Sequence, residues 1–302
     1  MTRFTVAFRA MGCQVNIWLE TDQDGQRLLQ AVPAEVEAIE AVLSRFRPES
    51  ELSRLNQQPG QWVEVSETLL ANILAAKQGA RITNGLYHPL LLDALVAAGY
   101  DRSFEQVESS EESISIPPVT DWQEIQVNIA QRKVCIPAPI DVGGVAKGWT
   151  AEQIAKRLSA YGACLVDIGG DMAARGAPEE SSGWEVAVAE PGGSEGDIVH
   201  VVVHNASIVT SGKDFRHWQR GGQNHHHIID PRTGKSAETD VVAVTVMHPY
   251  APTAEVYAKA VMLLGSQDGL AWINQQPNAS ALAVCDDGSV LATHAFELCF
   301  VQ

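Results

Sequence analysis

Residues 140–148 read IDVGGVAKG and place a carboxylate, two adjacent glycines, a lysine and a third glycine between an apolar run and a predicted helix. Glycines let backbone N–H groups approach an anion because no Cβ stands in the way. The start of the following helix adds the positive end of its dipole, and Lys147 adds a mobile positive charge. The segment therefore predicts a phosphate-binding turn, although an ordinary strand-to-helix turn has the same pattern.

Three later segments combine glycine with polar residues in a similar way. They read DIGGD at residues 167–171, TSG at residues 210–212 and HIIDPRTG at residues 227–234. A single Gly-Gly pair is a weak sign of a ligand site. Because the pattern recurs along the chain, the sequence favours a functional interpretation of residues 140–148 over a plain turn.

The 302 residues carry a formal net charge of −16. Nucleic acids and anionic membrane surfaces are bound mainly through clustered Lys and Arg, so this charge argues against both as partners. An anionic ligand must therefore be held by local backbone dipoles and a few cations. With 45% hydrophobic residues the chain can bury a full core, and its length suits one large domain or two.

The five cysteines, at positions 13, 135, 164, 285 and 299, are scattered and form no C-x-x-C pair. Such a set predicts reduced, mostly buried thiols in a cytoplasmic protein. Residues 1–19 alternate like a strand and contain charges, unlike the continuous apolar core of a signal peptide. Since no apolar run reaches the roughly 18 residues of a membrane span, we expect a soluble, cytoplasmic protein without membrane insertion.

Short apolar stretches recur along the chain, some alternating with polar residues and some continuous as in buried strands. They predict strands at residues 4–10, 14–19, 164–168, 184–189, 198–204, 207–209, 226–229, 241–247, 281–284 and 290–293. Helical spacing predicts helices at residues 26–45, 66–81, 148–159, 254–264 and 266–274, and a short one ending at residue 98. Runs of strands joined by hairpins, with helices between the blocks, predict an α+β fold with largely antiparallel sheets and flanking helices.

The connecting segments differ in character. Pro33 marks a late start or a break in the first helix. Residues 46–56 predict a polar loop led by Phe46, and residues 125–128 with 134–136 predict a hairpin. Residues 101–124, rich in Ser and Glu, predict an exposed, mobile acidic insertion. We expect a single domain over residues 1–302 that includes this insertion.

Three consecutive histidines, His225 to His227, precede the turn-forming sequence DPRTG. Successive side chains of a strand point to opposite faces, so at most two of the three share a side and a three-histidine metal site is disfavoured. One histidine facing a cleft suffices for general acid or base catalysis near neutral pH. Turn geometry and a surface ion pair explain Asp230 and Arg232 by themselves. Spacing alone likewise indicates a solvated helix salt bridge for Glu255 and Lys259, which lie four residues apart.

In this order the motifs resemble the ApbE-type FAD:protein FMN transferases. The resemblance runs from Met11 to about Gly265, nearly the whole chain. Several ordered motifs are more specific than any one of them. The segments concerned are Met11-Gly12, residues 50–56 (SELSRLN), 141–148 (DVGGVAKG), 168–171 (IGGD), 210–212 (TSG) and 227–234 (HIIDPRTG).

The resemblance implies an α+β fold and FAD as bound substrate. Members of the family use a magnesium ion as they cleave the FAD pyrophosphate, move FMN onto a Thr or Ser hydroxyl of a target protein and release AMP. Some instead hydrolyse FAD to FMN and AMP. Pyrophosphate cleavage requires neutralised phosphate charge, oriented N–H groups and a base for the attacking hydroxyl, and the sequence offers candidates for each.

Matching motifs assign roles to particular residues. The resemblance places His227 as the base that activates the acceptor hydroxyl, with Asp141 and Lys147 as further catalytic residues. The positions expected to contact FAD are Met11, Phe46 and Tyr87 along the flavin, then His88, Asp141, Lys147 and the backbone near Ile229. The positions that match metal ligands are the carbonyl of Gly144, Glu255 and Lys259.

The chain departs from the family pattern at charged positions. The family's last metal motif reads Ala-Asp with a Thr four residues after the Asp, and Glu255 and Lys259 stand in those places here. Magnesium accepts the carboxylate of Glu255, but the protonated amine of Lys259 has no lone pair and repels the ion. This ammonium group is suited instead to the cation's place against the pyrophosphate. His88 replaces a usual Asp, and Lys213 stands where an Asp commonly follows Ser-Gly.

Three functions are compatible with these residues. The first is FAD:protein FMN transfer with an altered metal site, which needs an acceptor protein carrying a Thr or Ser. The second is a non-catalytic FAD-binding module that stores flavin or presents it to a partner. The third is an FAD pyrophosphatase. Release of AMP separates the second from the others, and AMP release without an acceptor indicates the third.

Overall fold

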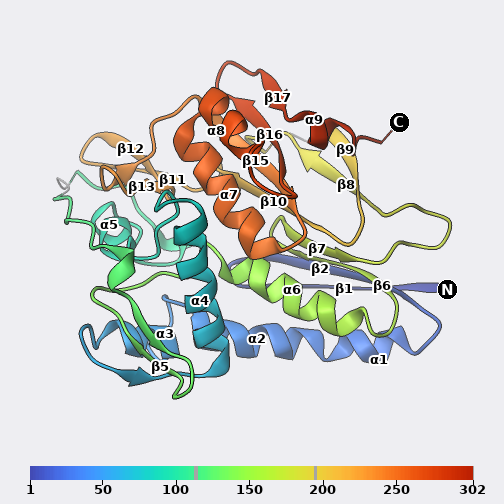
Figure 1. Cartoon of the computed structure of the whole chain (residues 1–302), viewed down its shortest axis with the longest axis horizontal. Coiled ribbons are helices and arrows are strands. Elements are labelled where there is room, and N and C mark those ends of the chain that lie inside the picture. The colour runs from blue at the N-terminus through green and yellow to red at the C-terminus, as the bar shows by residue number, and fades with distance from the viewer. Residues whose placement is uncertain (112–114, 194–195, 302) are drawn as a thin grey trace. The chain divides into compact units, whose positions relative to one another are not determined.

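The computed structural model describes residues 1–111, 115–193 and 196–301. The chain forms two compact units, each built from segments that are distant in sequence, and Figure 1 labels their helices and strands. Unit 1 comprises Met1–Ala38, Lys147–Gly212 and Thr239–Gln302, and unit 2 comprises Ile39–Ala146 and Lys213–Glu238. A single domain over residues 1–302 stays a prediction.

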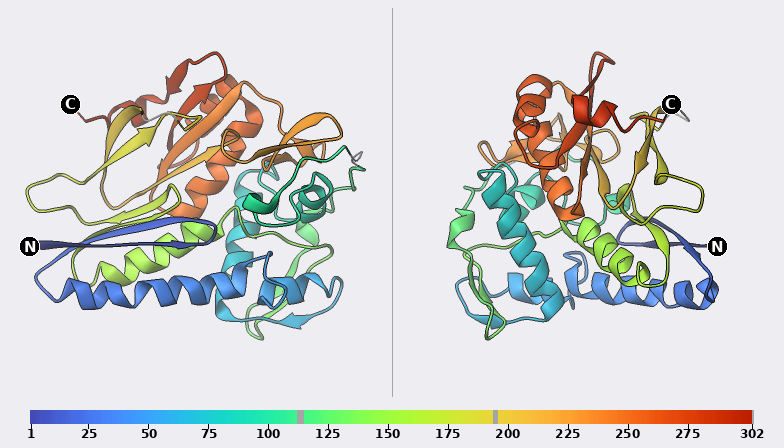
Figure 2. Two further views of the ribbon diagram at one scale, coloured as in Figure 1. Left: turned by 180° about the vertical axis from the view of Figure 1, so that it is seen from behind. Right: turned by 45° about the vertical axis from the view of Figure 1, so that its right-hand side comes forward.

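Unit 1 is built on an eight-stranded sheet in which neighbouring strands pair antiparallel. In spatial order the strands are β1 (Thr2–Ala10), β2 (Cys13–Thr21), β6 (Ala163–Ile168), β7 (Asp171–Arg175), β10 (Ser207–Gly212), β15 (Val241–His248), β16 (Ser280–Cys285) and β17 (Val290–Ala292). Figure 2 shows β1, in blue, at one edge of this sheet. The fold class predicted from the sequence is therefore confirmed.

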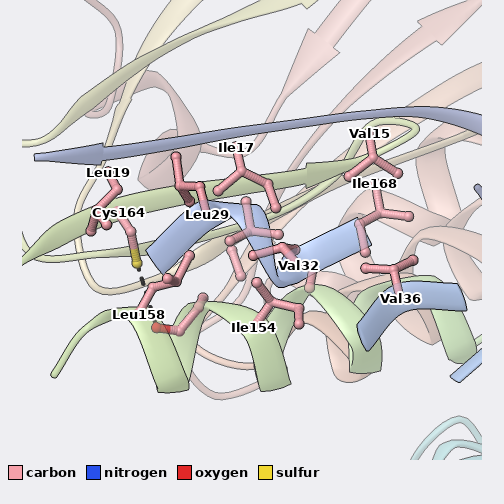
Figure 3. Close-up of a cluster of buried hydrophobic side chains, with 14 residues drawn as sticks. Val15, Ile17, Leu19, Leu29, Val32, Val36, Ile154, Leu158, Cys164 and Ile168 are labelled. Carbon is pink, nitrogen blue, oxygen red and sulfur yellow. Dashed lines mark hydrogen bonds between the residues drawn. The ribbon is translucent and has the colours of Figure 1, made fainter. Parts of the chain in front are cut away.

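Helices cover one face of the sheet in unit 1. These are α1 (Gly25–Gln30), the first part of α2 (Val32–Leu43) and α6 (Ala146–Leu158). Their buried side chains Leu29, Val32, Val36, Ile154 and Leu158 pack on Val15, Ile17, Leu19, Cys164 and Ile168 of the strands (Figure 3). Fully burying an aliphatic side chain contributes about 1.5–3 kcal/mol, so this layer is a main source of stability.

The opposite face of the same sheet is also covered. The hairpin of β8 (Trp184–Ala189) and β9 (Asp197–Val203), together with α9 (His294–Glu297), packs there on Leu165 and Ala174. Strand β6 is therefore buried on both sides, which explains why its sequence is almost continuously apolar instead of alternating. The last two helices of unit 1, α7 (Ala251–Leu264) and α8 (Ser266–Ile273), contact β15 and β16 respectively.

Unit 2 combines short helices with small sheets. Its helices are α3 (Glu51–Asn56), α4 (Glu67–Ile82), α5 (Leu92–Ala97) and the 3-10 turns η1 (Phe104–Gln106) and η2 (Trp122–Glu124). One small sheet has the order β3 (Val63–Glu64), β5 (Lys133–Cys135) and β4 (Gln126–Asn128). Two ribbons pair β11 (His217–Arg220) with β12 (Gln223–His226) and β13 (Ile229–Asp230) with β14 (Lys235–Ser236).

Several predicted elements are confirmed by their local interactions. Helix α4 begins after Ser66, whose Oγ accepts a hydrogen bond from the N–H of Leu69 at 3.2 Å. The predicted hairpin is the antiparallel pair β4 and β5. The predicted first helix, over residues 26–45, is divided into α1 and α2 at Ala31, and Pro33 lies in the first turn of α2, where its missing N–H costs nothing.

Two predictions about local structure are wrong. Residues 46–56 are not all loop, because Ser50 accepts the N–H of Ser53 at 3.0 Å and starts the one-and-a-half-turn helix α3. A helix of six residues is too short for apolar periodicity to reveal it. Residues 226–229 do not form one strand, because β12 ends at His226 and β13 begins at Ile229.

The insertion predicted at residues 101–124 is described only in part. Residues 112–114 lie outside the described residues. Within the rest, the N–H of Ser110 donates to the carbonyl of Gln219 at 3.1 Å, and the N–H of Gly221 donates to the carbonyl of Ser110 at 2.8 Å. The mobility of the insertion stays a prediction. All five cysteines are free thiols, as predicted, but the prediction that they are mostly buried is wrong, because only Cys164 and Cys285 are buried and the other three are half-buried. Among the described residues, the helices are too short or too polar to cross a bilayer.

Candidate functional site

Unit 1 brings three of the predicted site residues together. Lys147, in the first turn of α6, forms a close ion pair with Asp171 at the start of β7. Glu255 and Lys259 are one turn apart in α7, with Lys259 Nζ 3.7 Å from Glu255 Oε1. We call Lys147, Asp171, Glu255 and Lys259 the charged cluster. Its two carboxylates and two ammonium groups balance in formal charge.

Glu255 and Asp171 are the most deeply buried members of the charged cluster, each with a side chain only 1% exposed. Glu255 Oε2 accepts the N–H of Gly148 at 3.1 Å. A Cβ at position 148 would lie 2.9 Å from that oxygen and 3.0 Å from the carbonyl carbon of Ala251, so only glycine fits where α6 meets α7. Burial raises the pKa of Glu255 to about 7; Asp171 acts in the same direction, and both lysines of the cluster oppose it.

Sequence reasoning missed Glu152, one turn beyond Gly148 in α6. Its Oε1 accepts hydrogen bonds from Ser207 Oγ at 2.8 Å and from the N–H of Ala251 at 3.0 Å, and its Oε2 pairs closely with Arg175. A carboxylate at this place satisfies an N–H at the start of α7 and interacts favourably with the helix dipole. Glu152 therefore fixes the helix that bears Glu255 and Lys259. A Glu in an amphipathic helix normally indicates a solvated side chain, so no sequence pattern could have revealed this role.

The charged cluster does not fit a magnesium ion. Glu255 is occupied by Lys259 and by the Gly148 N–H, and Asp171 is occupied by Lys147. A divalent ion at the Glu255 carboxylate would lie beside the Lys259 ammonium and repel it. Over residues 1–111, 115–193 and 196–301 there is no group of three His, Cys, Asp or Glu side chains suited to hold a metal.

Unit 2 contains a row of four rings, Phe46, Tyr100, Trp218 and His225, which we call the aromatic row. Successive ring centroids are 5.7, 5.5 and 6.5 Å apart. The guanidinium carbon of Arg45 lies 4.2 Å from the Phe46 centroid and 4.5 Å from the Tyr100 centroid, close enough for a cation–π interaction with both. Phe46 is exposed and the other three rings are buried. The row therefore ends in one ring that remains available for stacking.

Arg45 also connects the aromatic row to the glycine turn of unit 2. Its Nε lies 3.5 Å from Asp141 Oδ2, and its side chain is only 7% exposed. Asp141 Oδ1 accepts the N–H of Gly143 at 2.7 Å, and the N–H of Asp141 donates to the carbonyl of Pro89 at 2.9 Å. Asp141 thus shapes the turn by binding a backbone amide that the sequence assigned to a phosphate. The phosphate-binding role of the turn stays a prediction.

The sequence HIIDPRTG forms a turn in unit 2 that is stabilised by an ion pair and a backbone hydrogen bond. Arg232 binds Asp230 through paired contacts, including NH2 to Oδ2 at 2.7 Å, and the N–H of Gly234 donates to the carbonyl of Asp230 at 2.8 Å. Turn geometry and an ion pair therefore account for these residues, as the spacing indicated. His227 is half-buried between β12 and β13, and Ile229 is buried in β13.

The remaining predicted positions lie in segments that connect helices and strands. In unit 1, Met11 has a positive φ of 52° between β1 and β2. In unit 2, Tyr87 is buried, Gly144 is half-buried before α6, and His88 Nδ1 accepts a backbone N–H at 3.2 Å. Burial lowers the pKa of His88, which favours the neutral ring. The contacts of all four with FAD stay predictions.

The fold and these residues define a class of protein. It is an α+β protein with a cluster of lysines and carboxylates in one unit and a row of aromatic rings beside a buried arginine in the other. Lysines suit phosphate groups, and aromatic rings suit a planar ligand. The model of the ApbE family matches residues 11–283, and the chain belongs to the ApbE family.

Named relatives agree with this membership. An FAD:protein FMN transferase of Treponema pallidum is 31% identical over 280 residues, which cover 84% of this chain and 76% of the relative. One of Vibrio cholerae is 26% identical, covering 82% and 76%. The crystal structure of an ApbE protein of Thermotoga maritima matches all of both chains with a TM-score of 0.89 at 24% identity, and so supports the fold. The flavinyl transferase ApbE of Pseudomonas stutzeri matches with a TM-score of 0.83 at 22% identity, over 99% and 97% of the two chains.

Proposed function

We propose that this chain is an FAD:protein FMN transferase. It would move FMN from FAD to a Thr or Ser hydroxyl of an acceptor protein and release AMP. The main observation is the 31% identity, over 84% of the chain, to a protein named for this activity. The lysine–carboxylate pairs of unit 1 and the aromatic row of unit 2 support it, because FAD presents both a pyrophosphate and a planar ring.

The proposed chemistry is a phosphoryl transfer. The acceptor oxygen forms a bond to the phosphorus on the FMN side of FAD, and the bond from that phosphorus to the bridging oxygen breaks, so AMP leaves with the electron pair. His227 takes the proton of the acceptor hydroxyl. Lys147, oriented by Asp171, neutralises charge that develops on the phosphate oxygens. Asp141 orients Arg45 and the glycine turn.

The proposal assigns the flavin ring to Phe46 and Tyr87 of unit 2. Phe46 is the better supported of the two, because its ring is exposed at the end of the aromatic row and Arg45 lies against it. We further propose that Lys259 supplies positive charge where the family uses magnesium, so that FAD binds without the metal. A cytoplasmic location is part of the proposal as well, and the five free thiols support it.

The direct test is incubation with FAD and a Thr-containing acceptor domain, with magnesium or with EDTA. Transfer is expected as an increase in acceptor mass by one FMN, with an equal amount of AMP released. A yellow protein that releases no AMP would identify an FAD-binding module instead. AMP released equally without an acceptor would identify a pyrophosphatase.

The residue test is His227→Ala. The variant is expected to retain FAD and to lose transfer, because the acceptor hydroxyl has no base. His294→Ala is the matched control, since the His294 side chain is 84% exposed on α9. Transfer by His227→Ala at the rate of the control would contradict the role of His227.

A further inference from the structure

The break between β12 and β13 is held by side chains. His226 closes β12, where it pairs with His217 across the ribbon, and the next ladder begins only at Ile229. In a continuous strand the backbone groups of residues 226–228 would bond to a neighbouring strand. Here the ring of His226 and the hydroxyl of Ser236 serve as partners for part of that backbone.

The imidazole of His226 makes two hydrogen bonds across the break. Nδ1 accepts the N–H of Ile228 at 3.2 Å, and Nε2 lies 2.9 Å from the carbonyl oxygen of Ala237. A carbonyl can only accept, so Nε2 must carry the proton, and an Nδ1 that accepts must be unprotonated. Both bonds therefore require the neutral Nε2–H tautomer.

Ser236 forms two hydrogen bonds with the main chain of His226. The N–H of His226 donates to Ser236 Oγ at 3.1 Å, and that hydroxyl donates to the carbonyl of His226 at 2.8 Å. The N–H of Ala237 donates to the carbonyl of Ile228 at 2.9 Å. The residues on either side of His227 are thus tied to the strand that follows the DPRTG turn.

We infer that His226 is a positioning residue for His227. Its ring fixes the backbone at 226 and 228 and so sets the direction in which the side chain of the intervening residue points. In a continuous strand the side chains of the three histidines would point to alternate faces. The break between β12 and β13, held by the hydrogen bonds of His226 and Ser236, removes that constraint. This role rests on the proposed function, in which His227 is the base.

The surroundings of His226 favour the same tautomer. Burial is the main cause that lowers the pKa of His226, and Lys213, His225 and His217 act in the same direction, whereas the bond to the Ala237 carbonyl raises it. The ring is therefore neutral at neutral pH, as both of its hydrogen bonds require.

The test compares His226→Ala and His226→Asn with the wild type. Alanine removes both ring bonds. Asparagine can still accept the N–H two residues later, as in an Asx turn, although it does not reach the Ala237 carbonyl. We expect His226→Ala to lower kcat for transfer roughly 10- to 100-fold, because displacing a catalytic base by about 1 Å slows the reaction by up to this factor. His226→Asn should recover most of the loss. His217→Ala, an exposed histidine across the same ribbon, is the control and should keep the wild-type rate.

Two further readouts separate positioning from plain structural damage. The acid limb of the pH–rate profile should stay at its wild-type pH in both variants, because the base is unchanged. Nitrogen-15 NMR of the wild type should show the Nε2–H tautomer at His226 and a ring that titrates below an ordinary histidine. Three results would each overturn the inference. His226→Ala could keep the wild-type kcat, a folded His226→Asn could have a kcat as low as that of His226→Ala, or the ring of His226 could titrate like an ordinary histidine. A wild type without transfer would refute the proposed function itself, and the NMR result would still show whether the ring bonds exist.

Discussion

Lys259 leads to a specific prediction about whether FAD binding to this chain depends on magnesium. Replacing it by Thr, the residue that the family pattern places there, removes one of the two positive charges of the charged cluster. The cluster then carries a formal charge of −1, from Asp171, Glu255 and Lys147. We expect the wild type to bind FAD equally well with magnesium or EDTA, and Lys259→Thr to bind FAD tightly only with magnesium.

The expected magnitude is that of one charged hydrogen bond between the Lys259 ammonium and the ligand, and the ion pair with Glu255 shows how strongly this ammonium interacts. At 3.7 Å, the separation of Lys259 Nζ and Glu255 Oε1, two unit charges interact by about 4.5 kcal/mol at an effective dielectric constant of about 20. Lys259 is 19% exposed, so water weakens this interaction. A hydrogen bond from a charged group contributes about 1.5–3 kcal/mol net. Removing the ammonium should therefore weaken FAD binding in EDTA about 10- to 100-fold.

The assay is titration of FAD fluorescence in EDTA and in excess magnesium. Lys156→Thr, the same replacement at an exposed position on α6, is the matched control and should bind like the wild type. Circular dichroism checks that both variants fold, since Lys259→Thr leaves the buried Glu255 carboxylate without its ion-pair partner. Magnesium should also stabilise Lys259→Thr against unfolding, because a bound ion favours the folded state.

The reasoning would be refuted by wild-type protein that binds FAD only when magnesium is present. Equal FAD affinity of the wild type and Lys259→Thr in EDTA would refute it as well, since the ammonium would then contribute nothing to the ligand.

Two predictions concern packing and burial. Gly148→Ala should lower the free energy of unfolding by up to about 2 kcal/mol in urea titrations. The clash with Ala251 and Glu255 costs about 1–3 kcal/mol, and the gain in helix propensity offsets roughly 1 kcal/mol of it. A variant more stable than the wild type would contradict this prediction. Burial raises the pKa of Cys164 to about 12, so this thiol should resist iodoacetamide at about pH 8.5 while the partly exposed Cys13 and Cys135 react. Because its folded pKa is raised, its contribution to stability is complete below the ordinary thiol pKa and is lost as the pH rises towards 12.

Features that depend on neighbours along the chain could be predicted from the amino-acid sequence. A period-two apolar pattern located β2, because one residue step sends a side chain to the other face of a sheet, and continuous apolar runs located β6 and β15. Ser66 marked the start of α4 through its own hydroxyl, and DPRTG marked a turn. Ordered motifs from Met11 onward identified the family, which the match over residues 11–283 confirmed.

Predictions from local sequence patterns failed where contacts with a second, distant segment determine the local structure. His226 belongs to an apparently continuous strand until Ser236 and Ala237, on the far side of a turn, offer its ring and backbone other partners. Glu152 looks solvated until Ser207 and the start of α7 surround it.

The same limit applies to the candidate site. Spacing shows that Glu255 and Lys259 share a helix face, but only the packing of α6 on α7 removes Glu255 from water and raises its pKa. Phe46, Tyr100 and Trp218 come from three distant segments, and no local pattern predicts that they stack. Burial, charge balance and ring contacts depend on which surfaces meet in space, and the tertiary structure alone decides that.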